Sequence, residues 1–438
     1  MKSGVTRKLL PILFAILITL PGIYVRIAHI HLSAPLTAII AGVAILGASF
    51  LLLWACDAAQ ADIPQALALA VVALIAVLPE YAVDMYFTWQ AGQHPAAEYR
   101  HFAIANMTGA NRLLIGVAWV VIVVIFWFKT RKAVRIERER RTELFFLGLA
   151  TVYAFIIPIK GSLAWYDGIV FLGLYAAYIF IAGRRPCEEC DAEGPAELLM
   201  NLPKQKRQLT TSLLFIFAAA AILANAEPFS EGLIGTGTAF HVSKFLLVQW
   251  LAPIASEAPE FIVAIMFTLR GKAGLALGSL LSAKLNQWTL LVGMIPGIYS
   301  LSAGHIHPMV LDNVQRPELL LTAAQSLLAV LLLASLRLNI GQALLLFGLF
   351  AGQLILPNLI AMFPSLAFLG LKGEQIHQVF SIMYITAAIA IFVDSPKRIV
   401  NLWQGRKVAI PGCGENNHHQ LAHKQQQEEE ALHYAGRL

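Results

Sequence analysis

Long apolar runs separated by short polar segments make up most of this chain. Each run has about the 20 residues that a helix needs to cross the hydrocarbon core of a bilayer. The runs cover residues 8–28, 34–56, 63–90, 101–128, 143–161, 165–183, 209–226, 244–269, 273–300, 318–336, 340–363 and 374–394. The pattern therefore predicts an all-α integral membrane protein with about 12 transmembrane helices.

The basic residues between these runs fall mostly on one side of the predicted membrane. Of the 32 Lys and Arg, 24 lie on the side of both termini, 6 lie on the opposite side, and Arg112 and Lys284 lie inside runs. Because cytoplasmic loops are enriched in Lys and Arg, we expect both termini in the cytoplasm and a multi-pass protein of the plasma membrane, in a bacterium the inner membrane. A cleaved signal peptide is the alternative interpretation of the first run, which is longer than the usual apolar core of such a peptide.

The composition excludes other classes of protein. Hydrophobic residues make up 58% of the chain and charged residues 13%, against about 45–50% and 25% in soluble domains. No stretch has the ordinary composition of a soluble catalytic domain, and the sequence has no P-loop, Rossmann glycine motif or nucleophile elbow. We therefore expect neither an enzyme nor a bound cofactor. The net charge of +6 comes from loop residues and does not predict nucleic-acid binding.

Two polar segments carry residue types that bind metals in other proteins. Cys187 and Cys190 in the loop 184–208 have the spacing of zinc ligands, and the Gln-, Glu- and His-rich tail 412–438 contains Cys413. A second ligand pair with zinc-site spacing is missing from the sequence. We interpret these segments as an exposed reduced loop and a solvated cytoplasmic tail, and a regulatory metal site is the alternative.

Acidic residues interrupt two of the apolar runs. Glu80 and Asp84 lie in the third run, and Glu257 and Glu260 lie in the eighth. In each pair the two carboxyl groups share one face of a helix, because residues three or four apart are neighbours there. An ionisable residue within a membrane span costs at least about 2.5 kcal/mol on insertion scales and is a functional candidate.

A proline precedes one glutamate of each pair. Proline has no N–H to bond the carbonyl four residues earlier, so that Pro79 releases the carbonyl of Ile75 and Pro259 releases that of Ala255. Carbonyl and carboxylate oxygens are the ligands of hard cations such as Ca²⁺ and Na⁺, and broken helices at the midplane form ion sites in many transporters. The alternative is a structural proline kink beside a neutralised carboxylate.

The two acidic segments occupy corresponding places in two halves of the chain. Glu80 and Glu260 are 180 residues apart, and each is followed by a run of small and polar residues, at 104–116 and 275–293. By the loop charges, the span of Glu80 runs outward and that of Glu260 runs inward. The halves are therefore predicted to be inverted-topology repeats, which support alternating access around a site at their interface.

These segments resemble the α-repeats of the cation/Ca²⁺ exchanger superfamily, which includes the sodium/calcium exchangers. The resemblance covers about residues 76–116 and 255–293, and SEAPEFIVAIMFTLRGKAGLALGSLL in the second repeat is the most similar piece. It implies a divergent member with a central cation site shared by the two repeats. The family core has ten spans, so the first and last spans here would be additions.

The resemblance also implies roles for individual residues. Glu80 and Glu260 match the central coordinating glutamates of the family. Asn106 matches the amide of its first Gly-Asn pair, and Ser279 stands where the second repeat carries Asn or Asp. Asn111 would support the same coordination shell.

The chain departs from the family pattern near these positions. The Thr-Ser pair before Leu-Pro-Glu is Ala76-Val77 here, and the second repeat has Ser256-Glu257. Asp84, Glu257 and Ser256 are therefore candidate additional ligands or proton carriers.

Two cations, Lys284 and Arg112, lie at nearly the same depth as the carboxyl groups. Four carboxylates in one low-dielectric pocket do not all stay ionised unpaired, and these cations would compensate two of the charges. One hypothesis is that Lys284 takes the place of a Na⁺ ion of the relatives, so that protonation replaces sodium as the coupling step. The alternative is that both cations are fixed ion-pair partners in a rearranged or inactive site.

The resulting organisation has five parts. Residues 1–33 form an additional N-terminal span, 34–208 the first repeat half with the cytoplasmic loop 184–208, and 209–363 the second repeat half. Residues 364–411 form an additional C-terminal span with a membrane-proximal segment, and 412–438 form the tail.

The sequence thus predicts a secondary active antiporter that exchanges Ca²⁺, Na⁺ or a related cation against H⁺ or Na⁺. Its partners would be the lipid bilayer and small inorganic cations, and the oligomeric state stays open. A non-transporting scaffold or sensor that retains the exchanger fold is the alternative. An enzyme acting on lipid-linked substrates is disfavoured, because the loops near Glu80 and Glu260 offer few polar residues.

Overall fold

The computed structural model describes residues 2–62, 77–96, 98–183, 194–362, 373–396 and 400. Four of the expectations above fall outside these residues. They concern the freed carbonyl of Ile75, the substitution at Ala76, the cysteine pair 187 and 190, and the tail 412–438.

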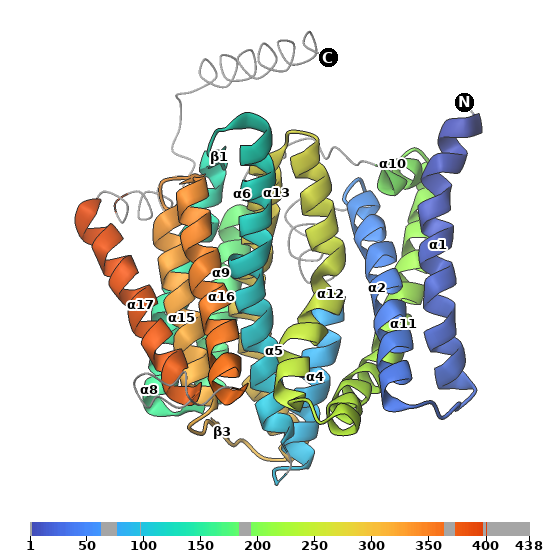
Figure 1. Ribbon diagram of the computed structural model, residues 1–438. Coiled ribbons are helices and arrows are strands. Elements are labelled where there is room, and N and C mark those ends of the chain that lie inside the picture. The colour runs from blue at the N-terminus through green and yellow to red at the C-terminus, as the bar shows by residue number, and fades with distance from the viewer. Residues whose placement is uncertain are drawn as a thin grey trace.

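The first half of the chain forms helices joined by two short strands (Figure 1). In order they are α1 (Lys2–Ile27), α2 (Ala34–Ala59), α4 (Leu78–Gln93), α5 (Tyr99–Leu113), the π-helix η1 (Leu114–Ala118), α6 (Trp119–Thr130), β1 (Val134–Arg135), the 3-10 helix η2 (Arg138–Arg140), α7 (Arg141–Ala154), α8 (Ile156–Lys160), β2 (Ser162–Leu163) and α9 (Trp165–Ala182). Helices α5, η1 and α6 follow one another without a break, so that together they make a single long span.

The second half repeats this order. It comprises α10 (Pro195–Met200), α11 (Lys204–Phe240), α12 (Lys244–Leu269), α13 (Ala273–Asn286), the π-helix η3 (Gln287–Leu291), α14 (Val292–Ala303), β3 (Met309–Val310), α15 (Gln315–Leu333), β4 (Arg337–Leu338), α16 (Ile340–Met362) and α17 (Gly373–Asp394). Again a π-helix interrupts one continuous span, here α13–η3–α14.

The predicted all-α membrane fold is confirmed. Ten helices of the described residues are long and apolar enough to cross a membrane. Two predicted runs lie outside this set: 63–90, of which the structure describes α4, and 273–300, which forms the helix α13–η3–α14. The described helix α4 has 16 residues, fewer than the 20 or so that cross a bilayer. The helix α13–η3–α14 is long enough, but polar residues such as Lys284 and Gln287 interrupt its apolar sequence.

Helix α11 is longer than its apolar run predicts, 37 residues against the predicted 209–226. The run ended early because Glu227 and Glu231 follow it. In the structure both side chains have partners: Arg26 pairs with Glu227 at 2.6 Å, and the hydroxyl of Tyr86 donates to Glu231 at 2.7 Å. Paired carboxylates are tolerated within a long helix where unpaired ones would not be.

The short strands show how the two halves are related. β3 begins 175 residues after β1 (134 to 309), and β4 begins 175 residues after β2 (162 to 337). β1 pairs with β4 and β2 pairs with β3, antiparallel in both cases, so that each strand pairs with one from the other half. β1 and its counterpart β3 lie at opposite ends of the bundle in Figure 1. The halves are therefore inverted repeats, as predicted.

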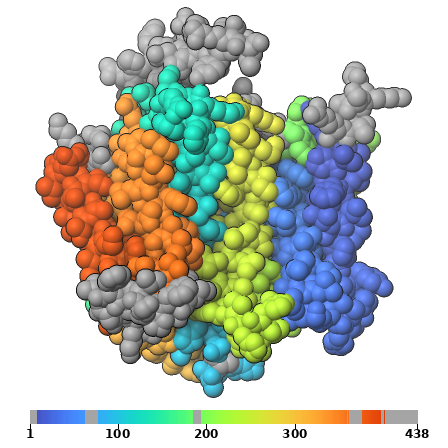
Figure 2. Space-filling model, viewed as in Figure 1, coloured from blue at the N-terminus to red at the C-terminus, as the bar shows by residue number. Residues whose placement is uncertain are grey.

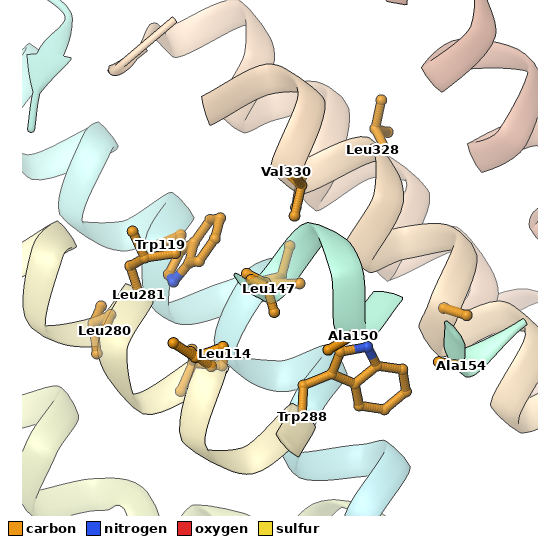
Figure 3. Close-up of a cluster of buried hydrophobic side chains, with 14 of the residues drawn as sticks. Leu114, Trp119, Leu147, Ala150, Ala154, Leu280, Leu281, Trp288, Leu328 and Val330 are labelled. Atoms are coloured by element: carbon orange, nitrogen blue, oxygen red, sulfur yellow. The ribbon is translucent and has the colours of Figure 1, made fainter. Parts of the chain in front are cut away.

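Apolar packing divides the bundle into two layers. The largest cluster of buried side chains joins η1, α6, α7, α13, η3 and α15, with Trp119 and Trp288 among Leu114, Leu147 and Leu280 (Figure 3). A separate cluster joins α1, α2, α10 and α11. The space-filling view shows the α1–α2 layer as a continuous strip at one side of the molecule (Figure 2). A third cluster lies between the layers and includes side chains of α2, α4, α5, α11 and α12.

Candidate functional site

Four carboxyl groups from α4 and α12 lie near one another in the bundle, three of them buried and the fourth, Glu260, half-buried. Glu80 and Asp84 are 2% and 0% exposed on α4, and Glu257 is 8% exposed on α12. Glu80 lies within electrostatic range of Asp84, Glu257 and Glu260. The structure thus brings together acidic residues that are about 180 positions apart in the sequence, one pair from each repeat.

The prolines position the two acidic helices in different ways. Pro79 is at the first turn of α4, where a missing N–H costs nothing, so that Glu80 lies at the helix start. There the N-terminal end of the helix dipole favours a negative charge. Pro253 and Pro259 lie inside α12, which stays helical from Lys244 to Leu269. Of the two acidic helices, therefore, only α4 begins at its Pro-Glu pair, as the expected broken-helix geometry requires.

Gln287, the first residue of the π-helix η3, joins the two acidic helices. Its side-chain nitrogen donates to Glu80 Oε2 and to Glu257 Oε1, both at 2.9 Å. Gln287 is fully buried. A residue of the second repeat therefore links the carboxylates of both repeats.

Several oxygens around these residues have no hydrogen-bond partner within the described part of the chain. They are Glu80 Oε1, Asp84 Oδ2, Asn106 Oδ1 and Gln287 Oε1. Asn106 Nδ2 donates to Asp84 Oδ1 at 3.2 Å, which directs its amide to the acidic group. Buried polar atoms are almost always satisfied in native proteins, and oxygens of these kinds are the ligands of hard cations. The cluster therefore has the donor atoms for a cation such as Ca²⁺ or Na⁺.

The arrangement is open rather than closed around an ion. Among the described residues, no three His, Cys, Asp or Glu side chains are grouped closely enough to hold a metal ion by themselves. A cation held here would also need an amide oxygen such as Oδ1 of Asn106, or a closer approach of α4 and α12.

Lys284 contacts the other repeat beside the acidic cluster. Its ammonium donates to Asn111 Oδ1 at 2.6 Å and lies 4.6 Å from the ring centre of Trp288. It is also within electrostatic range of Glu257 and Glu80. Lys284 thus lies near the carboxylates that it was expected to compensate, but its short hydrogen bond is to Asn111.

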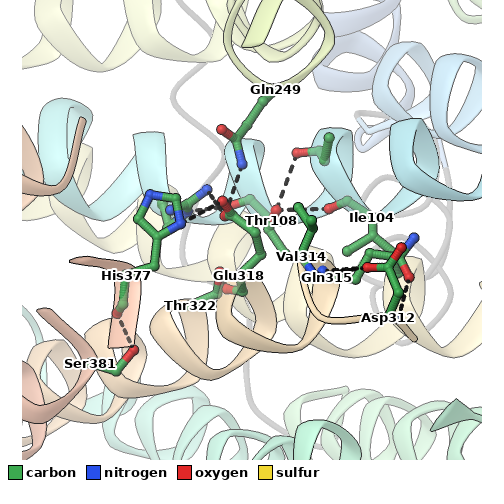
Figure 4. Close-up of polar contacts among 12 residues, drawn as sticks. Ile104, Thr108, Gln249, Asp312, Val314, Gln315, Glu318, Thr322, His377 and Ser381 are labelled. Carbon is green, nitrogen blue, oxygen red and sulfur yellow. Dashed lines mark hydrogen bonds and ion pairs between the residues drawn. The ribbon is translucent and has the colours of Figure 1, made fainter. Parts of the chain in front are cut away.

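Arg112 has a different partner from the one expected. Its guanidinium pairs with Glu318 of α15, a carboxylate that also accepts hydrogen bonds from Gln249 and, at 3.0 Å, from His377 (Figure 4). The guanidinium also lies 5.2 Å from the ring centre of Trp250. Arg112 therefore compensates a charge in a second, separate network, and not one of the four carboxylates.

The two serines proposed from the sequence are not placed as cation ligands require. Ser279 is exposed on α13. Ser256 is buried, but its hydroxyl donates to backbone carbonyls of its own helix, Ala252 at 3.2 Å and Pro253 at 3.3 Å.

Sequence reasoning missed the buried partners of the charged residues. Gln287, Gln249 and Glu318 are all at most 2% exposed, and each binds a charged side chain. All three are polar residues inside apolar runs, which is the signal that could have identified them.

The family expected from the repeats is confirmed by comparison with known proteins. The family model described as "Sodium/calcium exchanger protein" matches residues 33–183 and 210–357. The two matched segments correspond to the two inverted repeats, α2 to α9 and α11 to α16. A search of curated proteins gives no significant match.

Solved structures show the same fold. The chain is similar to the H⁺/Ca²⁺ exchanger CAX, with 41% identity and a TM-score of 0.86 over 92% of this chain and 99% of that one. It is also similar in fold to native YfkE (13% identity, TM-score 0.57, 85% and 99% covered). The sodium-calcium exchanger NCX_Mj, in crystals soaked with Na⁺ and Sr²⁺, shares 17% identity with a TM-score of 0.50, with 77% and 98% covered.

Proposed function

This chain belongs to the sodium/calcium exchanger protein family, and we propose that it is a secondary antiporter that exchanges Ca²⁺ for H⁺ across the plasma membrane. The observation that carries the proposal is the buried group of Glu80, Asp84 and Glu257, with unpartnered oxygens, at the junction of two inverted repeats. In this proposal both termini are cytoplasmic, and neither an enzymatic step nor a bound cofactor takes part.

The donor set favours Ca²⁺ as the transported cation. Carboxylate and amide oxygens suit Ca²⁺, which accepts six to eight oxygen ligands at about 2.3–2.6 Å in flexible geometry. The cluster offers such oxygens from Glu80, Asp84, Glu257 and Asn106. The similarity to an H⁺/Ca²⁺ exchanger at 41% identity over most of both chains supports the same choice.

The charge of the cluster favours H⁺ as the coupling ion. Buried carboxylates that lie close together cannot all remain ionised without a compensating cation. Binding of Ca²⁺ would therefore release protons, and loss of Ca²⁺ would take them up. Lys284 supplies an amine within electrostatic range of Glu257 and Glu80, in the region where relatives would use a second cation. Protons and Ca²⁺ would thus compete for the same oxygens, which is the requirement for exchange.

The two layers of the bundle provide the moving parts. The α1–α2 layer, to which α11 also belongs, has its own apolar cluster. It meets the larger layer through side chains of α2, α4, α5, α11 and α12. Because the acidic helices α4 and α12 belong to this boundary, sliding of one layer against the other would expose the site to one side and then the other.

Ion flux into proteoliposomes tests the proposal. Purified protein is reconstituted, and uptake of ⁴⁵Ca²⁺ is followed under an imposed pH gradient and then under an imposed Na⁺ gradient. We expect uptake with the pH gradient, and its loss in Glu80→Gln and Glu260→Gln. The matched control is Glu227→Gln, which removes a carboxylate that pairs with Arg26 at the surface and should leave uptake intact.

The opposite results would change the proposal. Uptake driven only by the Na⁺ gradient would show that Na⁺, and not H⁺, is the coupling ion. An absence of flux with well-folded protein would support the non-transporting scaffold or sensor.

A further inference from the structure

Gln287 is placed where a cation would bind both repeats at once. One nitrogen atom lies 2.9 Å from Glu80 Oε2 and 2.9 Å from Glu257 Oε1. Glu80 belongs to the first repeat, whereas Glu257 and Gln287 belong to the second. These two hydrogen bonds link the acidic residues of α4 and α12 directly.

The amide nitrogen resembles a bound ion in its distance from the two carboxylate oxygens and in the sign of its charge. A Ca²⁺ ion bound between these oxygens would lie about 2.3–2.6 Å from each, only slightly closer than the nitrogen does. The two N–H groups of the amide present partial positive charge to both carboxylates, so that they act as a weak cation. An ion bound to both oxygens and this nitrogen cannot be present together, because the nitrogen already lies within 2.9 Å of each oxygen.

No further hydrogen bond among the described residues holds the amide in this position. Among the described residues its oxygen, Gln287 Oε1, has no hydrogen-bond partner. The amide group is therefore held only by the two bonds to the glutamates. Because the oxygen is unpartnered, moving the nitrogen away breaks only the two bonds to the glutamates. Rotation about the terminal torsion of a Gln side chain, which would move it, meets a low barrier.

The two repeats differ at this position. Gln287 is the first residue of η3, and the first residue of η1 is Leu114, which packs in the apolar core. The first repeat therefore has an apolar residue where the second has an amide that reaches the acidic cluster.

We propose that Gln287 stands in for the transported cation between Glu80 and Glu257 in the empty site, and that cation binding displaces its amide. This inference rests on the proposed function. It assigns to Gln287 a positioning role: the amide keeps the two carboxylates together when no ion is present, and it lowers the affinity for the ion by competing with it.

Calcium titration of the purified full-length protein in detergent tests this inference. In Gln287→Ala the empty site loses two hydrogen bonds to carboxylates, so it becomes less stable relative to the Ca²⁺-bound state. By linkage, we expect the Kd for Ca²⁺ to fall by about tenfold. Gln287→Asn, whose amide is one methylene too short to reach both glutamates, should shift the Kd in the same direction and serves if the alanine variant does not fold.

A matched control separates this role from general stability. Gln249→Ala also removes a buried amide that donates to a glutamate, Glu318, but this glutamate lies in the Arg112 network. Both alanine variants should lower the Tm in Ca²⁺-free buffer. Saturating Ca²⁺ should restore the Tm of Gln287→Ala toward that of the wild type, whereas Gln249→Ala should keep its deficit and its wild-type Kd.

Each other outcome overturns a specific statement. An unchanged Kd in Gln287→Ala would make Gln287 a structural brace, and a raised Kd would make it an ordinary ligand; either result overturns the stand-in role while the proposed function survives. A wild-type protein that binds no Ca²⁺ overturns the proposed function itself, and this inference with it.

Discussion

The ammonium of Lys284 donates to Oδ1 of Asn111 at 2.6 Å and to its backbone oxygen at 3.2 Å. Both residues lie three positions before the π-helix of their own repeat, which begins at Gln287 and at Leu114. They are thus equivalent residues of the two inverted repeats, and they contact each other. Only residues at the local twofold axis can do so, which places Lys284 at the centre of the transporter and beside the acidic cluster.

We predict that Lys284→Met changes the coupling of transport. The variant keeps a long side chain but removes the amine that lies within electrostatic range of Glu257 and Glu80, leaving room for a second cation. Uptake of Ca²⁺ under a pH gradient should fall by at least about tenfold, in line with the usual effect of losing a residue that supports an ion site. Measurement of uptake against external pH and Na⁺ checks this. The control is Lys244→Met, which replaces a lysine whose ammonium lies 3.9 Å from Glu98. If Lys284→Met showed the same pH dependence of uptake as the wild type, the coupling role would be refuted.

The placement of Ser279 and Asn106 gives a second prediction. Ser279 is exposed, whereas Asn106 is buried and donates to Asp84. Ser279→Ala should therefore transport Ca²⁺ at the wild-type rate, and Asn106→Ala should reduce transport by roughly tenfold or more because it loses a supporting amide. Initial rates in proteoliposomes distinguish the two variants. Equal loss in both would mean that α13 turns Ser279 into the site during the transport cycle.

The ion pair of Arg112 and Glu318 leads to a prediction about stability. Removing one partner of a buried ion pair leaves an uncompensated charge and costs about 3–5 kcal/mol. Arg112→Met should therefore lower the thermal stability strongly. The double variant Arg112→Met/Glu318→Gln should recover part of this loss, since the carboxylate that Arg112 compensates is removed with it. Thermal unfolding in detergent measures both, and a double variant less stable than Arg112→Met would argue against the explanation.

Close packing of α5 against α12 predicts a contrast between two glycines. A Cβ at Gly109 would lie 1.8 Å from the backbone oxygen of Gln249, while a Cβ at Gly297 of α14 would meet no atom within 4 Å. Gly109→Ala should thus force the helices apart and destabilise the protein by about 1–3 kcal/mol. Gly297→Ala should be neutral or stabilising, because alanine favours helices by up to about 1 kcal/mol over glycine. Thermal unfolding of the two variants tests this directly, and similar unfolding temperatures would contradict it.

An ion pair outside the membrane-spanning segments predicts a dependence of stability on pH. Two nitrogens of Arg207 donate to Asp62, at 2.6 and 2.7 Å, and these bonds lower the pKa of Asp62 below its ordinary value. The pair therefore stabilises the fold fully above the pKa of Asp62 in the unfolded chain, about 3.9. This contribution is lost as the pH falls further, through the lowered pKa of the folded state.

The variant Asp62→Asn tests this linkage. At pH 7 it should be less stable than the wild type by about 0.2–1 kcal/mol, the range for pairs near the surface. The difference should stay constant down to about pH 5 and shrink below about pH 4. Thermal unfolding of both proteins between pH 3.5 and 7 provides the comparison, and a difference that grows on acidification would rule out the proposed cause.

Much of the fold can be predicted from the sequence, because a membrane span depends on residues that are consecutive in the chain. An apolar run of about 20 residues forms a membrane helix whatever it packs against, since no other structure satisfies its backbone in lipid. The acidic pairs at Glu80 and Glu260 were visible as charges inside such runs, and their spacing and orientation indicated the inverted repeats. The end of α11 was predicted too early because Glu227 and Glu231 have partners from other helices.

The sequence by itself therefore determined most of the spans, the repeats, the family resemblance and the acidic residues of the candidate site. Only the tertiary structure decided which side chains meet. Arg112 pairs with Glu318, 206 residues away, and Gln287 reaches Glu80, 207 residues away, while Ser279 faces outward. The physical reason is that hydropathy fixes where a helix lies along the chain, whereas its rotation about its own axis is set by packing against its neighbours.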